Sequence, residues 1–234
     1  MDRATWLREQ RLKAEADYDT RYSATYDADA EPMTTTHRRF VRRVVRASSV
    51  GGTVLDAACG TGKYFGIVLA AGRKAVGADQ SAGMLDGARA KFPAVELVRS
   101  SLQELDLERT FDGVMCIDAM ENVPPEEWPS VLANLHRALK PDGLLYLTVE
   151  EHEQADIDAG YADAIARGLP VVPGEHTFGG TAYHFIPTRP QVSDWIAAEG
   201  LSVIDEANSL GDGYSYWHLL MRQRVPEEEQ PTPG

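Results

Sequence analysis

Two patterns of hydrophobic and polar residues alternate along most of the chain: short apolar runs, and longer stretches in which apolar residues recur every three or four positions. The short runs are typical of buried strands, and the longer spacing is typical of helices that pack on one side. Because the two kinds of segment follow one another from residue 53 onward, we expect parallel strands joined by helices. The seven predicted strands cover residues 53–58, 74–79, 95–100, 111–118, 144–150, 201–207 and 214–223.

The connections between these strands carry helix signals. Helices are predicted from about Lys63 and over 81–91. The longest amphipathic pattern has apolar residues at i, i+3, i+4, i+7 and i+11, namely Trp128, Val131, Leu132, Leu135 and Leu139. We expect Pro141-Asp142-Gly143 to end that helix. Thr188 and Gln191 form a capping-box pattern at the start of a last helix, and the two strands that follow are close enough in sequence to pair antiparallel.

Three segments depart from this regular alternation. Residues 1–36 are polar with little strand pattern, so we expect one or two loosely anchored helices that act as a lid. Within a domain spanning 37–224, residues 151–187 are rich in proline and glycine and too long for an ordinary connection, which predicts an irregular, substrate-side insertion with a function. Residues 225–234 carry three glutamates and three prolines and are predicted to be a disordered tail.

A strongly amphipathic helix is predicted over 37–47. Its apolar face consists of Phe40, Val41, Val44 and Val45. Its other face carries five arginines, at positions 38, 39, 42, 43 and 46. The arginines form a solvated basic face, or one of them pairs with a ligand carboxylate, and the sequence leaves both interpretations open.

Composition narrows the classes of partner. The net charge of −13 argues against a surface that follows nucleic-acid phosphates, because such binding depends on Lys and Arg. Two isolated cysteines, Cys59 and Cys116, suit neither a disulfide framework nor a zinc site. No apolar run approaches the ~20 residues that span a bilayer, and the first ten residues lack a signal-peptide core. We therefore expect a cytoplasmic monomer or homodimer without metal, nucleic acid or membrane partner.

The strongest chemical signal is the stretch from Val54 to Gly62, where a strand leads into a glycine turn that opens a helix. Gly60 and Gly62 allow a ligand to approach the backbone closely. Nineteen residues after Gly60, Asp79 ends the next predicted strand, where its carboxylate can accept hydrogen bonds from both ribose hydroxyls. Together these residues predict a ligand that contains adenosine.

The same turn distinguishes between two adenosine ligands. A nicotinamide dehydrogenase would have the third glycine of G-x-G-x-x-G where Phe65 stands. Asp56 also places a negative charge in the turn, which repels a pyrophosphate but can hold the ammonium group of a methionine moiety, directly or through water. The alternative for Asp56 is a structural carboxylate that binds loop amides. The charge of the turn favours S-adenosylmethionine.

With these motifs, residues 37–223 resemble a class I S-adenosylmethionine-dependent methyltransferase of the group that modifies small molecules. The resemblance rests on the Asp56 to Gly62 turn, Asp79, and residues 80–85, 111–114 and 139–143. It implies a doubly wound α/β domain with a mostly parallel seven-stranded sheet, in the order 3-2-1-4-5-7-6 with strand 7 antiparallel. It also implies S-adenosylmethionine as cofactor, with Met84 packed on the adenine.

The chain departs from the family pattern at two places. Ser101 and Leu102 stand where the family often has an aspartate that accepts from the adenine amino group, so adenine recognition then rests on the Ser101 hydroxyl or on backbone groups. Glu121-Asn122-Val123 stands where many members have a histidine, so no histidine base is carried over from there. Tyr26 matches a tyrosine that the family often places over the cofactor, the alternative being that it only packs.

Parallel strands bring their carboxyl ends to one edge of a sheet, where ligands bind near the switch in strand order. The candidate cofactor-binding residues are Asp56, Gly60, Gly62, Asp79, Gln80, Met84, Ser101, Leu102, Asp118 and Tyr26. A base assists if the acceptor is a hydroxyl, a phenol or a protonated amine. The candidates for this base are His152, His184 and Glu121.

The sequence thus predicts S-adenosylmethionine-dependent methyl transfer to an O or N atom of a small organic acceptor, in specialised metabolism. The alternative is a catalytically inactive protein that binds an adenosyl ligand, or a regulatory protein, on the same fold. Asn122 and Ser101, which replace residues common in the family, are what motivates this alternative.

Overall fold

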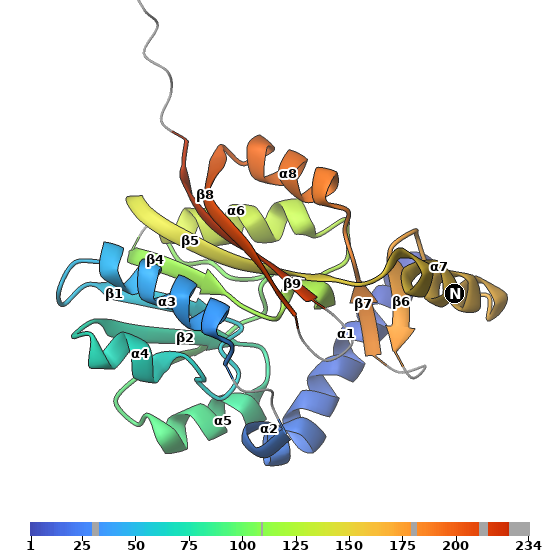
Figure 1. Ribbon diagram of the computed structural model, residues 1–234. Helices are drawn as coiled ribbons and strands as arrows, with labels where there is room; N and C mark the ends of the chain where they lie inside the picture. The colour runs from blue at the N-terminus through green and yellow to red at the C-terminus, as the bar shows by residue number, and fades with distance from the viewer. Residues whose placement is uncertain (30–32, 109, 179–181, 211–214, 225–234) are drawn as a thin grey trace, which may run out of the picture.

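The computed structural model describes residues 1–29, 33–108, 110–178, 182–210 and 215–224 (Figure 1). A seven-stranded sheet runs through the molecule in the order β3-β2-β1-β4-β5-β9-β8, with β9 antiparallel to both of its neighbours. The strands are β1 Thr53–Ala57, β2 Lys74–Asp79, β3 Glu96–Arg99, β4 Phe111–Cys116, β5 Leu139–Glu151, β8 Leu201–Leu210 and β9 Ser215–Gln223. The doubly wound α/β fold and the strand order predicted from the sequence are confirmed.

Helices cover both faces of the sheet and enclose two hydrophobic clusters. On one face lie α3 Thr35–Ala47, α4 Phe65–Ala70 and α5 Ala82–Lys91, which pack around Phe40, Phe65 and Tyr146 (Figure 1). On the other face lie α6 Trp128–Ala138 and α8 Arg189–Ala198, which pack around Trp128 and Leu145. Both faces of the central strands are therefore buried, as their near-continuous apolar sequences require.

The junction of α6 and β5 differs from the prediction. The helix ends at Ala138, and Leu139 already has extended backbone angles, φ −82° and ψ 135°, and pairs with Phe111 of β4. The expectation that Pro141-Asp142-Gly143 ends the helix, with the strand starting at 144, is wrong. Leu139 fits the helical spacing by coincidence, because its backbone already pairs with β4 while its side chain is buried in the same cluster as those of the helix. The strand β8 extends to Leu210, beyond the expected end, and Tyr214 lies outside the described residues.

Residues 151–187 are more regular than expected. They contain α7 Gln154–Ala166 and an antiparallel hairpin of β6 Glu175–Phe178 and β7 Ala182–Phe185. A Cβ atom on Gly160 of α7 would lie 2.7 Å from the Cβ atom of His176, so this glycine allows the helix to pack against the hairpin. The expectation of an irregular loop is wrong, because the prolines and glycines of this segment fall mainly in its turns.

The N-terminal segment is anchored more firmly than its polar sequence suggested. It forms α1 Arg3–Asp17, a π-helical turn Tyr18–Tyr22 and α2 Ser23–Asp29. Trp6 is 3% exposed and packs edge-on against Tyr183 of β7, with ring centroids 5.6 Å apart. The predicted disordered tail, 225–234, lies outside the described residues.

The arginines of α3 pair with β8 or face solvent. Arg39 and Arg43 both pair with Asp205 of β8. Arg38, Arg42 and Arg46 are exposed, so the described structure favours the solvated basic face over pairing with a ligand carboxylate. None of the described helices combines the length and the apolar character that crossing a membrane requires.

Candidate active site

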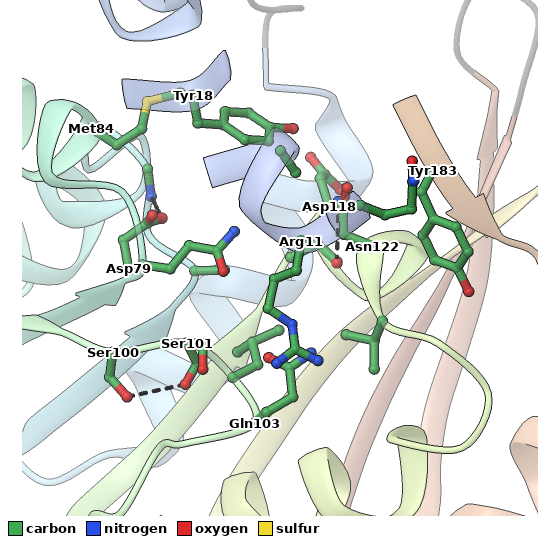
Figure 2. Close-up of a pocket in the computed structure, with 18 of the residues that line it drawn as sticks. Arg11, Tyr18, Asp79, Met84, Ser100, Ser101, Gln103, Asp118, Asn122 and Tyr183 are labelled. Atoms are coloured by element: carbon green, nitrogen blue, oxygen red, sulfur yellow. Dashed lines mark hydrogen bonds between the residues drawn. The ribbon is translucent and has the colours of Figure 1, made fainter. Parts of the chain in front are cut away.

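A pocket lies at the carboxyl ends of β1 to β4, and the N-terminal helices pass across it (Figure 2). Ligands of open α/β sheets bind at this edge, close to the point where the strand order reverses. Eight of the ten cofactor-binding candidates line the pocket: Tyr26, Gly60, Asp79, Gln80, Met84, Ser101, Leu102 and Asp118. The other two, Asp56 and Gly62, lie behind its wall.

Asp79 is held rigidly at the end of β2. Its Oδ2 accepts a hydrogen bond from the Gly60 amide at 2.8 Å, and its Oδ1 accepts from the Ser81 amide at 2.9 Å. Burial raises the pKa of this carboxyl group, although the two amides oppose the shift. Each carboxylate oxygen has further acceptor capacity, so the group can still bind two hydroxyls that enter from the pocket.

The two glycines of the turn after β1 are needed for different reasons. Gly60 has φ +52° and faces the pocket, where an added Cβ atom would meet only Tyr26 at 3.8 Å. Gly62 has φ +81°, and a Cβ atom there would come within 2.6 Å of the Phe65 ring. Gly60 thus keeps backbone exposed to a ligand, whereas Gly62 lets the chain turn tightly over Phe65.

Asp56 is a buried carboxyl group behind the pocket wall. It is 2% exposed, and its Oδ2 has no hydrogen-bond partner among the described residues. Burial, followed by the charges of Asp79 and Asp118, raises the pKa of Asp56 to about 8. A site with this excess of carboxylates and an unpartnered acceptor fits a cationic ligand such as a sulfonium amino acid.

The N-terminal segment is fastened to the pocket rim by two aspartates. Asp19 accepts hydrogen bonds from the Ser81 hydroxyl at 2.6 Å and from the Gly83 amide at 3.1 Å, at the start of α5. Asp27 accepts from the Thr61 hydroxyl at 2.6 Å and pairs with Lys91 at 2.7 Å. These contacts bring Tyr18 over the pocket (Figure 2), and Tyr26 also lines the pocket.

Asp118 lines the pocket and is oriented by a histidine. It has φ +53°, and its Oδ1 lies 3.1 Å from Nε2 of His37 and 3.2 Å from the Thr148 hydroxyl that donates to it. On the other side of the imidazole, Nδ1 of His37 lies 2.7 Å from the Thr34 hydroxyl. The sequence did not indicate His37 as a site residue, because it stands inside an ordinary amphipathic helix.

The candidate bases gather around Glu150, outside the pocket lining. His152 Nε2 lies 2.5 Å from one oxygen of Glu150, and His184 Nδ1 lies 3.2 Å from the other. Although burial opposes it, the bonds from these histidines lower the pKa of Glu150 to about 2. Burial and the charge of Glu150 raise the pKa of Glu121 well above its usual range, and Glu121 Oε2 has no partner among the described residues.

The three candidate bases relate differently to the ligand pocket. Glu121 lies next to Asn122, and His184 lies next to Tyr183, and both of these neighbours line the pocket. His152 instead lines a second cavity between α7 and the start of α8. Among the described residues, no three or more His, Cys, Asp or Glu side chains are grouped so that they could hold a metal ion.

Residues 54–143 match the methyltransferase domain family. The chain is 28% identical over 204 residues to a demethylmenaquinone methyltransferase of Renibacterium salmoninarum. The aligned region covers 83% of this chain and 85% of that relative. These matches support the prediction that the chain is a class I S-adenosylmethionine-dependent methyltransferase. This methyltransferase is also 30% identical over 144 residues to a ubiquinone/menaquinone biosynthesis C-methyltransferase of Campylobacter jejuni, spanning 57% of this chain and 60% of the relative.

Solved structures show the same fold. The 1,6-didemethyltoxoflavin-N1-methyltransferase of Burkholderia thailandensis superposes on this methyltransferase with a TM-score of 0.69 at 18% identity, covering 93% of this chain and 90% of the other. The magnesium protoporphyrin IX methyltransferase of Synechocystis gives a TM-score of 0.66 at 16% identity, covering 92% and 99%. Both were crystallised with S-adenosylhomocysteine.

Other pocket residues of this methyltransferase were not among the predicted cofactor-binding residues. Arg11 of α1, Gln103 after β3 and Asn122 all line the pocket, and Tyr183 reaches it from β7 (Figure 2). Arg11 and Tyr183 belong to segments whose placement depends on long-range contacts, so no local pattern marks them. Gln103 follows the expected adenine segment directly and is the one that spacing from Ser101 could have suggested.

Proposed function

We propose that this methyltransferase binds S-adenosylmethionine in the pocket and transfers its methyl group to an O or N atom of a small organic acceptor. The observation that carries the proposal is one continuous pocket with two kinds of wall. One end has the polar strand-edge residues Gly60, Asp79 and Ser101. Tyr183 lies on the opposite side of the pocket (Figure 2), and the lining also includes the apolar residues Leu7 and Val123, which suit an uncharged acceptor.

The cofactor end supplies a partner for each part of S-adenosylmethionine. Asp79 binds the ribose hydroxyls, Met84 packs on the adenine, and the backbone at Gly60 lies along the methionine moiety. The buried carboxyl group of Asp56 faces the positive charge of the ligand from behind the turn. This end of the pocket therefore offers acceptors to the hydroxyls and negative charge to the cationic groups of the cofactor.

The bound cofactor supplies an activated methyl group, so the chain's own residues align the acceptor and exclude water. Residues 1–36 act as a lid, held over the pocket by Asp19 and Asp27. The insertion 151–187 closes the acceptor end through Tyr183. One of the three candidate bases, Glu121, His184 or His152, receives the single proton that an O–H or N–H acceptor loses, and Glu150 holds the two histidines in place.

Radiolabelled methyl transfer tests this function. The purified chain is incubated with S-adenosylmethionine labelled on the methyl group and a panel of hydroxyl- and amino-substituted aromatic compounds. We expect labelled product from at least one of them, with the label on O or N when the product is analysed by NMR. Labelling on carbon would contradict the acceptor atom proposed. Cofactor binding without turnover on any acceptor would favour the inactive binding protein.

Cofactor affinity should depend on pH through Asp56. Its pKa is raised from 3.8 to about 8, so its carboxyl group holds a proton at neutral pH, and the ligand-free protein loses stability as the pH rises between these two values. A cationic ligand favours the ionised form, so affinity for S-adenosylmethionine should increase up to about pH 8, with release of a proton on binding. Calorimetry in buffers of different ionisation enthalpy measures this proton. Asp56→Asn should abolish its release, and an unchanged release would contradict the assignment.

A substitution at Gly83 should loosen the lid without disturbing the sheet. A Cβ atom there would lie 2.4 Å from the Asp19 carbonyl oxygen and 2.9 Å from the Ser23 hydroxyl. We therefore expect Gly83→Ala to displace residues 18–29 and to weaken S-adenosylhomocysteine binding about tenfold, equivalent to about 1.4 kcal/mol, in a calorimetric titration. Gly66→Ala on α4 is the matched control, because no atom of the described residues lies within 4 Å of its added Cβ atom. Equal affinities for the two variants would contradict the lid.

A further inference from the structure

The segment after β3 lies beside Asp79 and therefore next to any ribose that Asp79 binds. In the sheet, Asp79 is paired with Arg99, the last residue of β3, and the Ser100 amide donates to the Asp79 carbonyl oxygen at 3.0 Å. Ser101 and Gln103 both line the pocket at this end (Figure 2). A base attached to that ribose would therefore meet residues 101–103, and an adenine would bring a 6-amino group that needs an acceptor.

Most acceptors of this segment already accept a hydrogen bond. The Ser101 carbonyl oxygen accepts from the Ser100 hydroxyl at 3.0 Å and from the Glu104 amide at 3.2 Å. The carbonyl oxygens of Leu102 and Gln103 both accept from the side-chain amide of Asn134 on α6, at 2.9 and 3.0 Å. The Ser101 hydroxyl is engaged with Glu104 on its donor side and on its acceptor side, at 3.3 Å each.

The side chain of Gln103 is the exception, and its orientation is fixed. Its Nε2 donates to Oε2 of Glu127 at 2.8 Å. The same carboxylate accepts from Nη2 of Arg11 at 2.5 and 2.7 Å. Only the NH₂ side of an amide can face a carboxylate, so Oε1 of Gln103 must point the other way. Among the described residues, no donor bonds to this oxygen.

We propose that Oε1 of Gln103 accepts the hydrogen bond from the 6-amino group of the cofactor's adenine, and that Glu127 and Arg11 hold the amide in the orientation that allows it. This assignment rests on the proposed binding of S-adenosylmethionine in the pocket. It replaces the Ser101 hydroxyl and the backbone groups, which the sequence had suggested for this role. It also makes α1 part of adenine recognition, because Arg11 belongs to that helix.

The pair S-adenosylhomocysteine and S-inosylhomocysteine tests the assignment. The second compound has an oxo group in place of the 6-amino group, so it would set an acceptor against Oε1 of Gln103. A site that hydrogen-bonds a ligand group discriminates strongly against an analogue that cannot make the bond. In calorimetric titrations we expect the wild-type chain to prefer S-adenosylhomocysteine by tenfold or more. Gln103→Met, which keeps the length of the side chain, should reduce this preference to about threefold or less.

The ratio of the two affinities separates recognition from a structural role. If Gln103 only supported the fold, its replacement would weaken both ligands equally and leave the ratio unchanged. Glu127→Ala gives an independent test, because the freed amide can turn its NH₂ group toward the oxo group, and S-inosylhomocysteine should then bind more tightly than it binds to the wild type. Ser101→Ala should keep the wild-type ratio.

The outcomes distinguish this assignment from the proposed function. If the wild-type chain binds both ligands equally, or Gln103→Met keeps the ratio, the assignment is overturned while cofactor binding stands. Loss of the preference in Ser101→Ala but not in Gln103→Met would return the role to Ser101. If the wild-type chain binds neither ligand, the proposed function and this assignment both fail.

Discussion

Asp79→Ala should weaken S-adenosylhomocysteine binding by about 100-fold. We expect the carboxylate to accept hydrogen bonds from both ribose hydroxyls. A hydrogen bond to a charged group contributes about 1.5–3 kcal/mol, so a loss of about 3 kcal/mol of binding free energy is the lower limit for two such bonds. The substitution also leaves the Gly60 and Ser81 amides without their acceptor, which loosens the glycine turn that faces the ligand. A calorimetric titration of the variant measures the loss directly.

Asp86→Ala is the control for the charge lost in this variant. Asp86 lies on the exposed side of α5, where it pairs only with Arg89 among the described residues, and its side chain is 75% exposed. We expect wild-type affinity from this variant, and the circular dichroism spectra of both variants should match that of the wild type. Wild-type affinity in Asp79→Ala would show that the ligand does not lie on the end of β2.

Arg3→Met should release α1 and the β6–β7 hairpin from each other. Arg3 forms two hydrogen bonds to Glu175, at 2.7 and 2.8 Å, and the Glu175 side chain is 0% exposed. Without the guanidinium, the Glu175 carboxylate keeps two hydrogen-bond donors among the described residues, the Tyr183 hydroxyl and the Val172 amide. Breaking a buried pair from one side costs about 3–5 kcal/mol. The hydrogen exchange of α1 and hairpin amides should therefore accelerate about 100-fold or more.

Two further variants show whether the unpaired charge causes this effect. Arg3→Met combined with Glu175→Gln should restore much of the protection, because no buried charge is then left without a partner. Arg89→Met removes an arginine from an exposed pair and should leave the exchange rates unchanged. Unchanged exchange in Arg3→Met itself would mean that Trp6 and its contact with Tyr183 hold α1 in place without the ion pair.

The sheet could be predicted because its strands carry their own signals. The strands β1, β2, β4 and β5 each contain an apolar run and are each followed by a helix. This local pattern is sufficient to give the strand order once the family resemblance is added. The junction at Leu139 could not be predicted, because the same residue satisfies the spacing of α6 and the pairing of β5. Only its contact with Phe111 decides between them.

The site was predictable where the chain reaches it directly from a strand. Gly60, Asp79 and Asp118 follow β1, β2 and β4, so topology alone places them together. Arg11 and Tyr183 enter the pocket from segments far away in the sequence, and the contacts that position them are ion pairs and ring packing between those segments. His152 and His184 were predicted as candidate bases, but their common contact with Glu150 was not. The hairpin that brings His184 to Glu150 was expected to be an irregular loop.

A crystal structure of the chain with S-adenosylhomocysteine tests the central claim most directly. We predict the ribose hydroxyls on the Asp79 carboxylate, the adenine beside residues 101–103 and the methionine moiety along Gly60. A ligand bound elsewhere, or one with its adenine at the Tyr183 end of the pocket, would contradict the account.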